Sequence, residues 1–310
     1  MIYYGRKCLG LFLLVCCLTM TIVEAHHWTA DKNDRAGWNQ EAQARAYFHH
    51  SDLQLQWAMR ALAEIKLTPD AHILDFGCGD GKLSSILAAQ VPHGSVLGVD
   101  VSYPMIHLAQ RKFGSRTAKN LRFQVIEDLS DVLDEPALPF DWVTSFCVFH
   151  LIDDPSSVLK GMRQLLREGG HVLLVIPAHS PPGLIEAANQ TFEEIGLKPP
   201  WSEEEYSQKK QPPMRAASSC CSCIESAGFL ITQFEEESRP YVFYDRQELT
   251  DWFVGTLASN WGVPWEEAPV FFRRTVELWT QLYPDCQNED GSIDFACKYF
   301  VCLARKPVGR

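Results

Sequence analysis

Ile73-Leu74-Asp75-Phe76-Gly77-Cys78-Gly79-Asp80-Gly81 is the stretch that decides the fold of this 310-residue chain. A short, mainly apolar run ends in three glycines at alternate positions, and residues 82–90 follow with helical spacing of apolar side chains. Glycines between a strand and a helix let the backbone turn tightly and approach a ligand closely. The spacing is not the G-x-G-x-x-G of dinucleotide-binding proteins, because Lys82 stands where that pattern requires glycine. The stretch predicts a first strand, a ligand-binding turn and a first helix.

The same alternation of apolar runs and helical patterns continues along the chain. We expect strands at residues 72–76, 95–100, 121–126, 142–149 and 171–176, with helices at 82–90, 103–113 and 155–167, the last ended by Gly169 and Gly170. Strands that alternate with helices in this way form a parallel sheet covered on both faces. The sequence therefore predicts an α/β fold, Rossmann-like and doubly wound. Its mostly parallel seven-stranded sheet is completed by strands at 229–234 and 295–304, and a helical lid insertion accompanies it.

Four parts follow from these patterns. We expect a leader at residues 1–25, an N-terminal helical cap at 26–67, a Rossmann-like core at 68–178, and the lid insertion with closing helices and strands at 179–310. Residues 177–213 are rich in Pro, Glu and Lys, and residues 215–227 have the pattern of a helix. The aromatic side chains of 246–283 have two interpretations, a packed core and a hydrophobic lid over a substrate pocket.

Composition favours small-molecule chemistry. The chain has 28 basic and 39 acidic residues, a formal net charge of −11, and 46% of its residues are hydrophobic. These values are typical of a globular protein, and a net negative field repels nucleic acid backbones. We therefore expect no nucleic acid partner.

The first twenty-five residues have the order of a secretory signal peptide. Arg6 and Lys7 precede an apolar run at residues 8–23, and small residues follow up to Ala25. The run is shorter than the roughly 18–20 residues that cross a bilayer comfortably. Export, with a secreted or lumenal location after cleavage, is the preferred interpretation. An uncleaved membrane anchor through residues 8–23 is the alternative, and only then do we expect a membrane as partner.

The pattern of cysteines does not predict a metal site. Eight of the eleven lie after residue 25, a number that permits disulfides without fixing any pairing. Cys220, Cys221 and Cys223 include one C-x-x-C, but no second such pair exists to complete a zinc site.

Two carboxylates lie where ligands bind in a sheet of this kind. Asp75 is near the end of the first predicted strand, and Asp100 ends the second, 25 residues later. A carboxylate at the second position can accept hydrogen bonds from both ribose hydroxyls of a bound nucleoside. The sequence thus predicts a nucleoside-containing ligand at the carboxyl edge of the sheet.

The ordered motifs LDFGCGDG, LGVDVS, FDWVTSFCVFHLIDDP and LLREGGHVLLVIP resemble those of class I S-adenosylmethionine-dependent methyltransferases over residues 74–177. The resemblance implies S-adenosyl-L-methionine as cofactor. It places Asp75, Gly77, Cys78 and Gly79 at the methionine part, Asp100 at the ribose and Val101 at the adenine. It also places an acidic residue near the adenine amine, where this chain has Glu127-Asp128-Leu129.

Residues before the first strand and after the fourth resemble one branch of that family. It contains the trans-aconitate, juvenile-hormone-acid and malonyl-carrier-protein carboxyl O-methyltransferases. The resemblance implies that Tyr47 closes over the cofactor and that Ser51 and Gln54 meet the substrate, as does His150 after the fourth strand. The tryptophan that typically follows this histidine is Leu151 here, so the acceptor is left open. Tyr47 and Gln54 also suit an ordinary amphipathic helix.

The chemistry of methyl transfer limits what the protein has to supply. A sulfonium methyl is already electrophilic, so alignment and exclusion of water are the main tasks. A carboxylate acceptor needs no base, whereas a hydroxyl or amine needs one, for which His150 is the candidate. His150 can also simply hydrogen-bond the acceptor or lie in the core. We therefore expect a methyltransferase acting on a small molecule, with a carboxylic acid as the preferred acceptor. An NAD-dependent oxidoreductase and a catalytically silent cofactor-binding protein are the alternatives.

Overall fold

The computed structural model describes residues 38, 40–114, 118–133, 135–136, 139–197, 214 and 216–309. The expected leader and the first part of the expected cap, residues 1–37, lie outside this range, and both stay predictions. The four-part division of the chain likewise remains a prediction.

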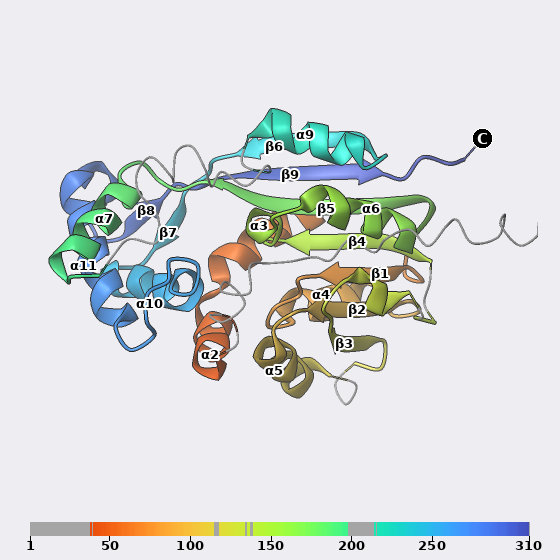
Figure 1. Cartoon of the computed structure of the whole chain (residues 1–310), viewed down its shortest axis with the longest axis horizontal. Coiled ribbons are helices and arrows are strands. Elements are labelled where there is room, and N and C mark those ends of the chain that lie inside the picture. Colours follow the sequence, from red (N-terminus) through yellow and green to blue (C-terminus); the bar gives the residue numbers. More distant parts are fainter. Residues whose placement is uncertain are drawn as a thin grey trace, which may run out of the picture.

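One seven-stranded sheet organises the molecule, with the strand order β3-β2-β1-β4-β5-β9-β6 that runs from bottom to top on the right of Figure 1. Its strands are β1 (His72–Phe76), β2 (Ser95–Asp100), β3 (Leu121–Val125), β4 (Phe140–Phe146), β5 (Leu166–His179), β6 (Leu230–Glu237) and β9 (Lys298–Arg305). The pairs among β1 to β5 are parallel, and β9 lies antiparallel between β5 and β6. The predicted mostly parallel, seven-stranded sheet is confirmed.

Helices cover both faces of this sheet, as the doubly wound fold requires. One face packs against α3 (Asp52–Ala63), α4 (Lys82–Gln90) and α5 (Tyr103–Phe113). The opposite face packs against α6 (Pro155–Leu165) and α9 (Ala217–Ser226). Alternate residues of β1, β2, β5 and β9 therefore belong to two separate apolar clusters, because successive side chains of a strand point to opposite faces.

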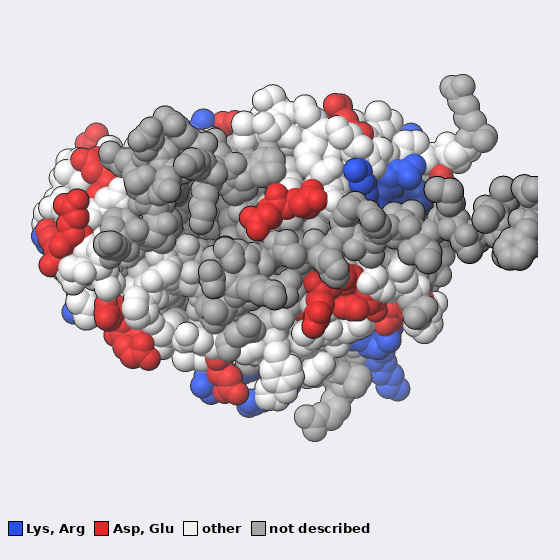
Figure 2. Space-filling model, in the orientation of Figure 1, with Lys and Arg blue, Asp and Glu red and all other residues white. Residues whose placement is uncertain are grey.

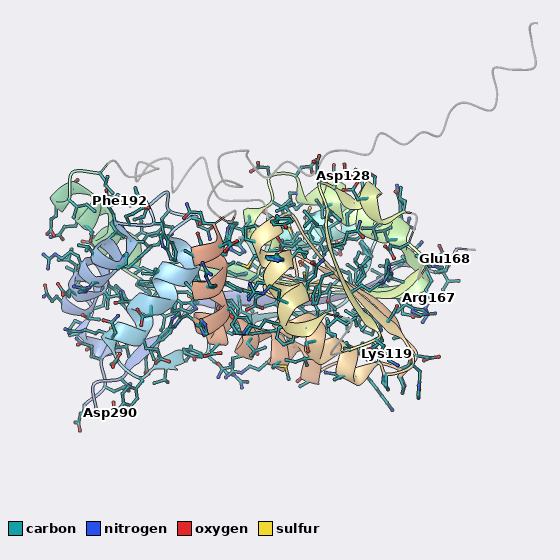
Figure 3. The ribbon with its side chains drawn as sticks, turned by 90° about the horizontal axis from the view of Figure 1, so that it is seen from below. Lys119, Asp128, Arg167, Glu168, Phe192 and Asp290 are labelled. Carbon is teal, nitrogen blue, oxygen red and sulfur yellow. The ribbon has the colours of Figure 1, made fainter. Side chains whose placement is uncertain are left out.

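The aromatic segment forms a helical half beside the sheet, at the left of Figure 1. It contains α7 (Leu184–Glu194), α10 (Arg246–Leu257) and α11 (Ala268–Leu282), with a small sheet of β7 (Tyr241–Phe243) and β8 (Ile293–Phe295). Phe253, Phe271, Phe272 and Phe295 are fully buried there. The packed-core interpretation of these aromatic residues is confirmed. In Figure 3, Phe192 and Asp290 lie at this end, and Lys119, Arg167 and Glu168 at the other.

The N-terminal cap joins the two halves. Helix α2 (Glu41–His50) packs against α10, and α3 follows it directly over the sheet. The Nε1–H of Trp252, on α10, donates a hydrogen bond to Oε1 of Gln54, on α3, at 3.0 Å. The helical half is thus connected to the sheet through the same residues that the sequence places near the ligand.

Several predicted boundaries were wrong. The fourth strand ends at Phe146 rather than 149, since Cys147 has a positive φ of 59° that an extended strand does not accommodate. The fifth begins at Leu166 and passes through Gly169 and Gly170, so these glycines do not end the preceding helix. Residues 295–304 divide between β8 and β9, and the Pro-, Glu- and Lys-rich stretch 177–213 contains helix α7.

Surface charge is dispersed on the face shown in Figure 2. Asp and Glu occur there in several separate groups, and Lys and Arg in a few small ones. Among the residues for which a placement is given, no helix is long and apolar enough to cross a bilayer.

Replacing Gly81 by Ala tests how tightly the turn packs against the sheet. Gly81 has a φ of +80°, and an added Cβ would lie 2.7 Å from Ala109 Cβ and from the ring of Phe123. We expect a loss of about 2–4 kcal/mol in the free energy of unfolding, from left-handed strain and overpacking together. Gly196→Ala is the matched control, because Gly196 has a φ of +74° and open space around it. Equal losses for the two variants in urea denaturation would contradict the packing argument.

Candidate active site

The glycine turn is fastened to the second strand by backbone hydrogen bonds. The amides of Gly77 and Cys78 both donate to the carbonyl oxygen of Val99, at 2.8 and 3.0 Å. Gly77, Gly79 and Gly81 all have positive φ values, of 72°, 52° and 80°. Only glycine adopts this region readily at successive alternate positions, so the three glycines fix the course of the turn.

One of the three glycines faces open space. A Cβ on Gly77 would overlap Val148 at 2.2 Å, and one on Gly81 would overlap Ala109 and Phe123. A Cβ on Gly79 would meet only the ring of Tyr47, at 3.8 Å. Gly79 therefore presents its backbone to the side on which a ligand binds.

Asp100 connects the turn to the end of β2. Its Oδ2 accepts a hydrogen bond from the Gly79 amide and its Oδ1 accepts one from the Ser102 amide, both at 2.9 Å. A carboxylate has about four lone-pair sites, so two remain for a ligand. The side chain is half-buried at the carboxyl edge of the sheet. This is the geometry expected of a ribose-binding acid.

Asp75 supports the turn from inside the protein. It is buried at the end of β1, where Ser84 Oγ donates to its Oδ2 at 2.5 Å and Thr144 Oγ1 to its Oδ1 at 3.0 Å. Burial raises the pKa of Asp75 to about 6, against the lowering effect of the two hydroxyls. Both oxygens are committed to neighbours, so Asp75 positions the turn as well as lining the cavity above it.

Asp80 and Lys82 also belong to this site, and sequence reasoning missed both. Asp80 is 4% exposed and accepts hydrogen bonds from the Lys82 amide at 3.1 Å and from Ser51 Oγ at 3.3 Å. Lys82 Nζ lies 3.7 Å from the Asp80 carboxylate and donates to Ser51 Oγ and to the carbonyl of Phe48. Burial raises the pKa of Asp80 to about 6. Two charged residues within a glycine turn were the signal that could have identified them.

A small cavity lies between this turn and the cap. It measures about 30 Å³, room for about two water molecules. Its lining brings together residues of α2, α3, the turn and β4: Tyr47, Ser51, Gln54, Leu55, Asp75, Gly77, Cys78, Gly79, Asp80, Lys82, Leu83 and Phe146. Seven predicted site residues are thus gathered at one place.

The cap residues predicted from the family resemblance lie over the turn. Tyr47 lines the cavity and packs edge-on against Trp38, with ring centroids 5.6 Å apart. Burial raises the pKa of Tyr47 well above its ordinary value, and nearby carboxylates add to the rise, so the phenol stays protonated. Gln54 is held by Trp252, as described above. Neither side chain is an ordinary exposed position of an amphipathic helix.

Residues after the third strand have a structural role. Asp128 Oδ1 accepts hydrogen bonds from the Ser130 amide and hydroxyl, and the Glu127 side chain is exposed. Leu129 is buried against the face covered by α6. Figure 3 shows Asp128 at the surface of the sheet half. Their proposed place beside an adenine, like that of the half-buried Val101, stays a prediction.

His150 lies outside the cavity lining. It belongs to a 3-10 helix, η2 (Phe149–Leu151), which follows the left-handed residue Cys147. Such strain in a non-glycine residue is often found at functional sites. Burial raises the pKa of the Cys147 thiol to about 12, so it is neutral at ordinary pH. A catalytic role for His150 stays a prediction.

The described cysteines are all free, and Cys220, Cys221 and Cys223 lie on helix α9. Over the described ranges, no group of three or more His, Cys, Asp or Glu side chains is arranged to hold a metal ion.

The residues of the turn suit an adenosyl sulfonium. Asp75, Asp80 and Asp100 surround Gly79 with three carboxyl groups, against the single cation of Lys82. This excess of negative charge favours a ligand that carries a positive sulfonium and an ammonium group. Gly79 provides open backbone, and Asp100 has free acceptor sites for ribose hydroxyls.

Comparison with known proteins agrees with this geometry. Residues 74–172 match the family described as "Methyltransferase domain". The malonyl-[acyl-carrier protein] O-methyltransferase of a Paenibacillus species is 30% identical over 50% of this chain and 59% of its own. The juvenile hormone acid O-methyltransferase of Bombyx mori is 31% identical over 44% of this chain and 51% of its own. The trans-aconitate 2-methyltransferase of Deinococcus radiodurans is 30% identical over 51% and 58%.

A solved structure shares the fold at greater length. The phosphoethanolamine N-methyltransferase 2 of Haemonchus contortus, in complex with S-adenosylhomocysteine, is 17% identical with a TM-score of 0.57. It aligns with 90% of this chain and 60% of its own. The chain spans about half to three fifths of the length of the curated relatives named above.

Residues 74–172 therefore have the fold and the turn of a methyltransferase domain, and they resemble the class I enzymes that use S-adenosylmethionine. Within that class, the chain resembles the branch of the trans-aconitate and juvenile-hormone-acid O-methyltransferases. Nothing in these matches supports the oxidoreductase alternative.

Asp75→Asn tests the electrostatic cost of the buried turn. Below about pH 4 the carboxyl is protonated in both the folded and the unfolded chain. Between pH 4 and about 6 only the unfolded chain loses the proton, because burial raises the folded pKa to about 6. The contribution of the Asp75 carboxyl to the free energy of unfolding of the wild-type protein therefore falls as pH rises through this window. It stays reduced at higher pH.

We expect the stability of Asp75→Asn relative to wild type to increase by about 2 kcal/mol between pH 4 and pH 7 in the ligand-free protein. Denaturant unfolding at several pH values measures it. Asp153→Asn, at an exposed position, is the control that should show no such trend. A flat difference for Asp75→Asn would refute the assignment.

Proposed function

We propose that this chain is an S-adenosylmethionine-dependent methyltransferase that acts on a small molecule and methylates a carboxylate of it. The observation that carries the proposal is Asp100, which is fixed by the Gly79 and Ser102 amides and still has lone pairs available. The cofactor supplies an electrophilic methyl group on a positively charged sulfur. A carboxylate oxygen of the acceptor forms the new O–C bond as the S–C bond breaks, which yields a methyl ester and a neutral thioether.

The residues of this chain bind, orient and exclude water. Asp100 and the Gly79 backbone hold the nucleoside, and the acidic surroundings of the turn favour the cationic ligand over its neutral product. Tyr47 and Gln54 close the cap over the site and remove water from the reacting atoms. No proton has to be removed from a carboxylate acceptor, so this reaction needs no general base and leaves His150 to orient the acceptor.

A carboxylic acid is proposed as acceptor for two reasons. Two of the relatives carry names that refer to an acid, juvenile hormone acid and trans-aconitate. In addition, the described cavity is lined by the neutral Tyr47, Ser51 and Gln54 and by carboxyl groups, with Lys82 already engaged by Ser51, Asp80 and Phe48. Both oxygens of Asp75 and both of Asp80 already accept hydrogen bonds from the protein, so an acceptor that needs no base is the simpler assignment.

Methyl-labelled S-adenosylmethionine tests the reaction when it is incubated with purified protein and a panel of carboxylic acids, alcohols and amines. We expect label only in the acids, in a form released as methanol by mild alkali, as esters are. Alkali-stable label would show an ether or an N-methyl product and overturn the choice of acceptor. Cofactor binding without transfer to any acceptor would favour the catalytically silent alternative.

Asp100→Ala tests the cofactor site directly. Hydrogen bonds to a charged group contribute about 1.5–3 kcal/mol each, so affinity for S-adenosylmethionine should fall at least about tenfold. Calorimetry on folded protein measures it, with Asp153→Ala as the control that leaves affinity unchanged. Equal affinities of the two variants would remove the proposed site.

A further inference from the structure

Helix α3 carries a second polar cluster one turn beyond the cofactor cavity. Gln54 lines that cavity, and Trp57 and Arg60 follow at spacings of three residues along the same helix. Residues three apart are neighbours on a helix surface. The indole of Trp57 stacks on the phenol ring of Tyr299, with centroids 4.4 Å apart and an interplanar angle of 21°. Tyr299 belongs to β9, so the cluster joins α3 to the sheet.

All three side chains of this cluster have a buried polar atom without a partner. Over the described residues, no hydrogen bond of good geometry is made by Trp57 Nε1, Arg60 Nη1 or Tyr299 Oη, although the Arg60 guanidinium lies close enough to the Tyr299 phenol to lower its pKa as a hydrogen bond would. Trp57 is 3% exposed and Tyr299 is 0% exposed. Buried polar atoms in folded proteins nearly always have partners, so three unpartnered ones in contact require an explanation. The other such side chains include Gln43, Ser145 and Asn189, which lie on three different elements.

The three atoms have a common chemistry. An indole N–H and a guanidinium N–H are donors only, and a phenol donates its O–H. Burial raises the pKa of the Tyr299 phenol, which keeps that proton in place, and the neighbouring Arg60 opposes the rise. Arg60 has no ion-pair partner among the residues with a given placement. The Glu237 carboxylate, whose strand position pairs with Tyr299, forms an ion pair with Arg239 at 3.4 Å and none with Arg60, so no anion among the described residues is bound to the cluster.

Strand register places the cluster near the reacting atoms. Phe146, which lines the cofactor cavity on β4, pairs with Val175 on β5, and Val175 pairs with Val301 on β9. Tyr299 lies two residues from Val301 towards the carboxyl edge of β5 and shares the α3-covered face. Two strand spacings across the sheet and two residues along β9 together put Tyr299 on the order of 10 Å from the end of β4.

We propose that Trp57, Arg60 and Tyr299 form a distal acceptor subsite, which binds a carboxylate about 10 Å from the oxygen that is methylated. The inference rests on the proposed function and deepens it: the acceptor has two acidic groups, one esterified at the cofactor and one held here. A planar guanidinium matches a carboxylate in geometry and charge, and the indole and phenol hydrogens complete its coordination. A hydroxyl or amide of the acceptor is the rival occupant and is separated by the test.

The test measures binding rather than turnover. Wild-type protein saturated with S-adenosylhomocysteine is titrated calorimetrically with straight-chain dicarboxylates of increasing length and with the monocarboxylates and ω-hydroxy acids of the same lengths. We expect one length, spanning about 10 Å, to bind at least tenfold more tightly as the dicarboxylate than as either analogue. Equal affinity of dicarboxylate and hydroxy acid would identify the rival occupant, and equal affinity of all three series would overturn the subsite.

Variants test whether the preference for the dicarboxylate depends on the side chains of the cluster. Arg60→Gln and Tyr299→Phe should each reduce it about tenfold, and Tyr299→Phe keeps the ring that stacks on Trp57. Its melting temperature should be unchanged or higher, because the hydroxyl it removes has no partner. Lys66→Gln, just beyond α3 and exposed, loses the same charge as Arg60→Gln and should leave the preference intact. If Arg60→Gln and Lys66→Gln weakened the preference equally, the effect would come from the loss of net charge alone, and the proposed subsite would be refuted.

The two proposals fail in different ways. Loss of S-adenosylhomocysteine binding in wild type would contradict the proposed function. Normal cofactor binding with no dicarboxylate preference would contradict the distal subsite alone. A dicarboxylate that binds through Arg60 but is never methylated would keep the subsite and remove methyl transfer to this class of acid.

Discussion

The hydrogen bond from the Gly79 amide to Asp100 holds the functional end of this molecule together. It joins a turn that only glycine can form to the end of the neighbouring parallel strand, and the Gly77 and Cys78 amides add two bonds to Val99. Because the turn is fixed there, helix α4 begins at Lys82, and Lys82 in turn reaches Ser51 and Phe48 of the cap. Tyr47 then lies over Gly79. Cap, turn and sheet edge therefore form one structural unit.

This unit is electrostatically unfavourable without a ligand. Burial raises the pKa values of Asp75 and Asp80 to about 6 and also raises that of Asp100, so ionised forms are costly in the closed site. A cationic ligand offsets that cost when it binds, which couples its affinity to the charge of the turn. The same argument, with the sign reversed, applies to the distal cluster, where the half-buried guanidinium of Arg60 has no ion-pair partner among the residues with a given placement. The N-terminal end of α3 therefore borders a site that favours a cation, and the following turn borders a cluster that favours an anion.

Helix α3 is the element that relates these two environments. It presents Ser51 and Gln54 to the cofactor turn, Trp57 and Arg60 to β9, and receives Trp252 from the helical half. The aromatic residues of that half are a packed core, and the Gln54–Trp252 hydrogen bond joins this core to the cap. The proposed substrate subsite and the proposed closure over the cofactor therefore depend on the same helix.

The sequence by itself determined the alternation of strands and helices, the glycine turn and the two strand-end acids, because each depends on local backbone geometry and on a period of apolar residues. It could not fix the path of the chain after β4 or the start of β5, since the left-handed Cys147 and the glycines 169–170 take their conformations from antiparallel and parallel neighbours. Only the tertiary structure showed that Asp80 and Lys82 hold the cap, that Asp128 caps its own helix turn, and that Trp57 and Tyr299 meet across 242 residues of sequence. Such contacts depend on burial and on the distance between elements remote along the chain, and no local pattern of residues encodes either.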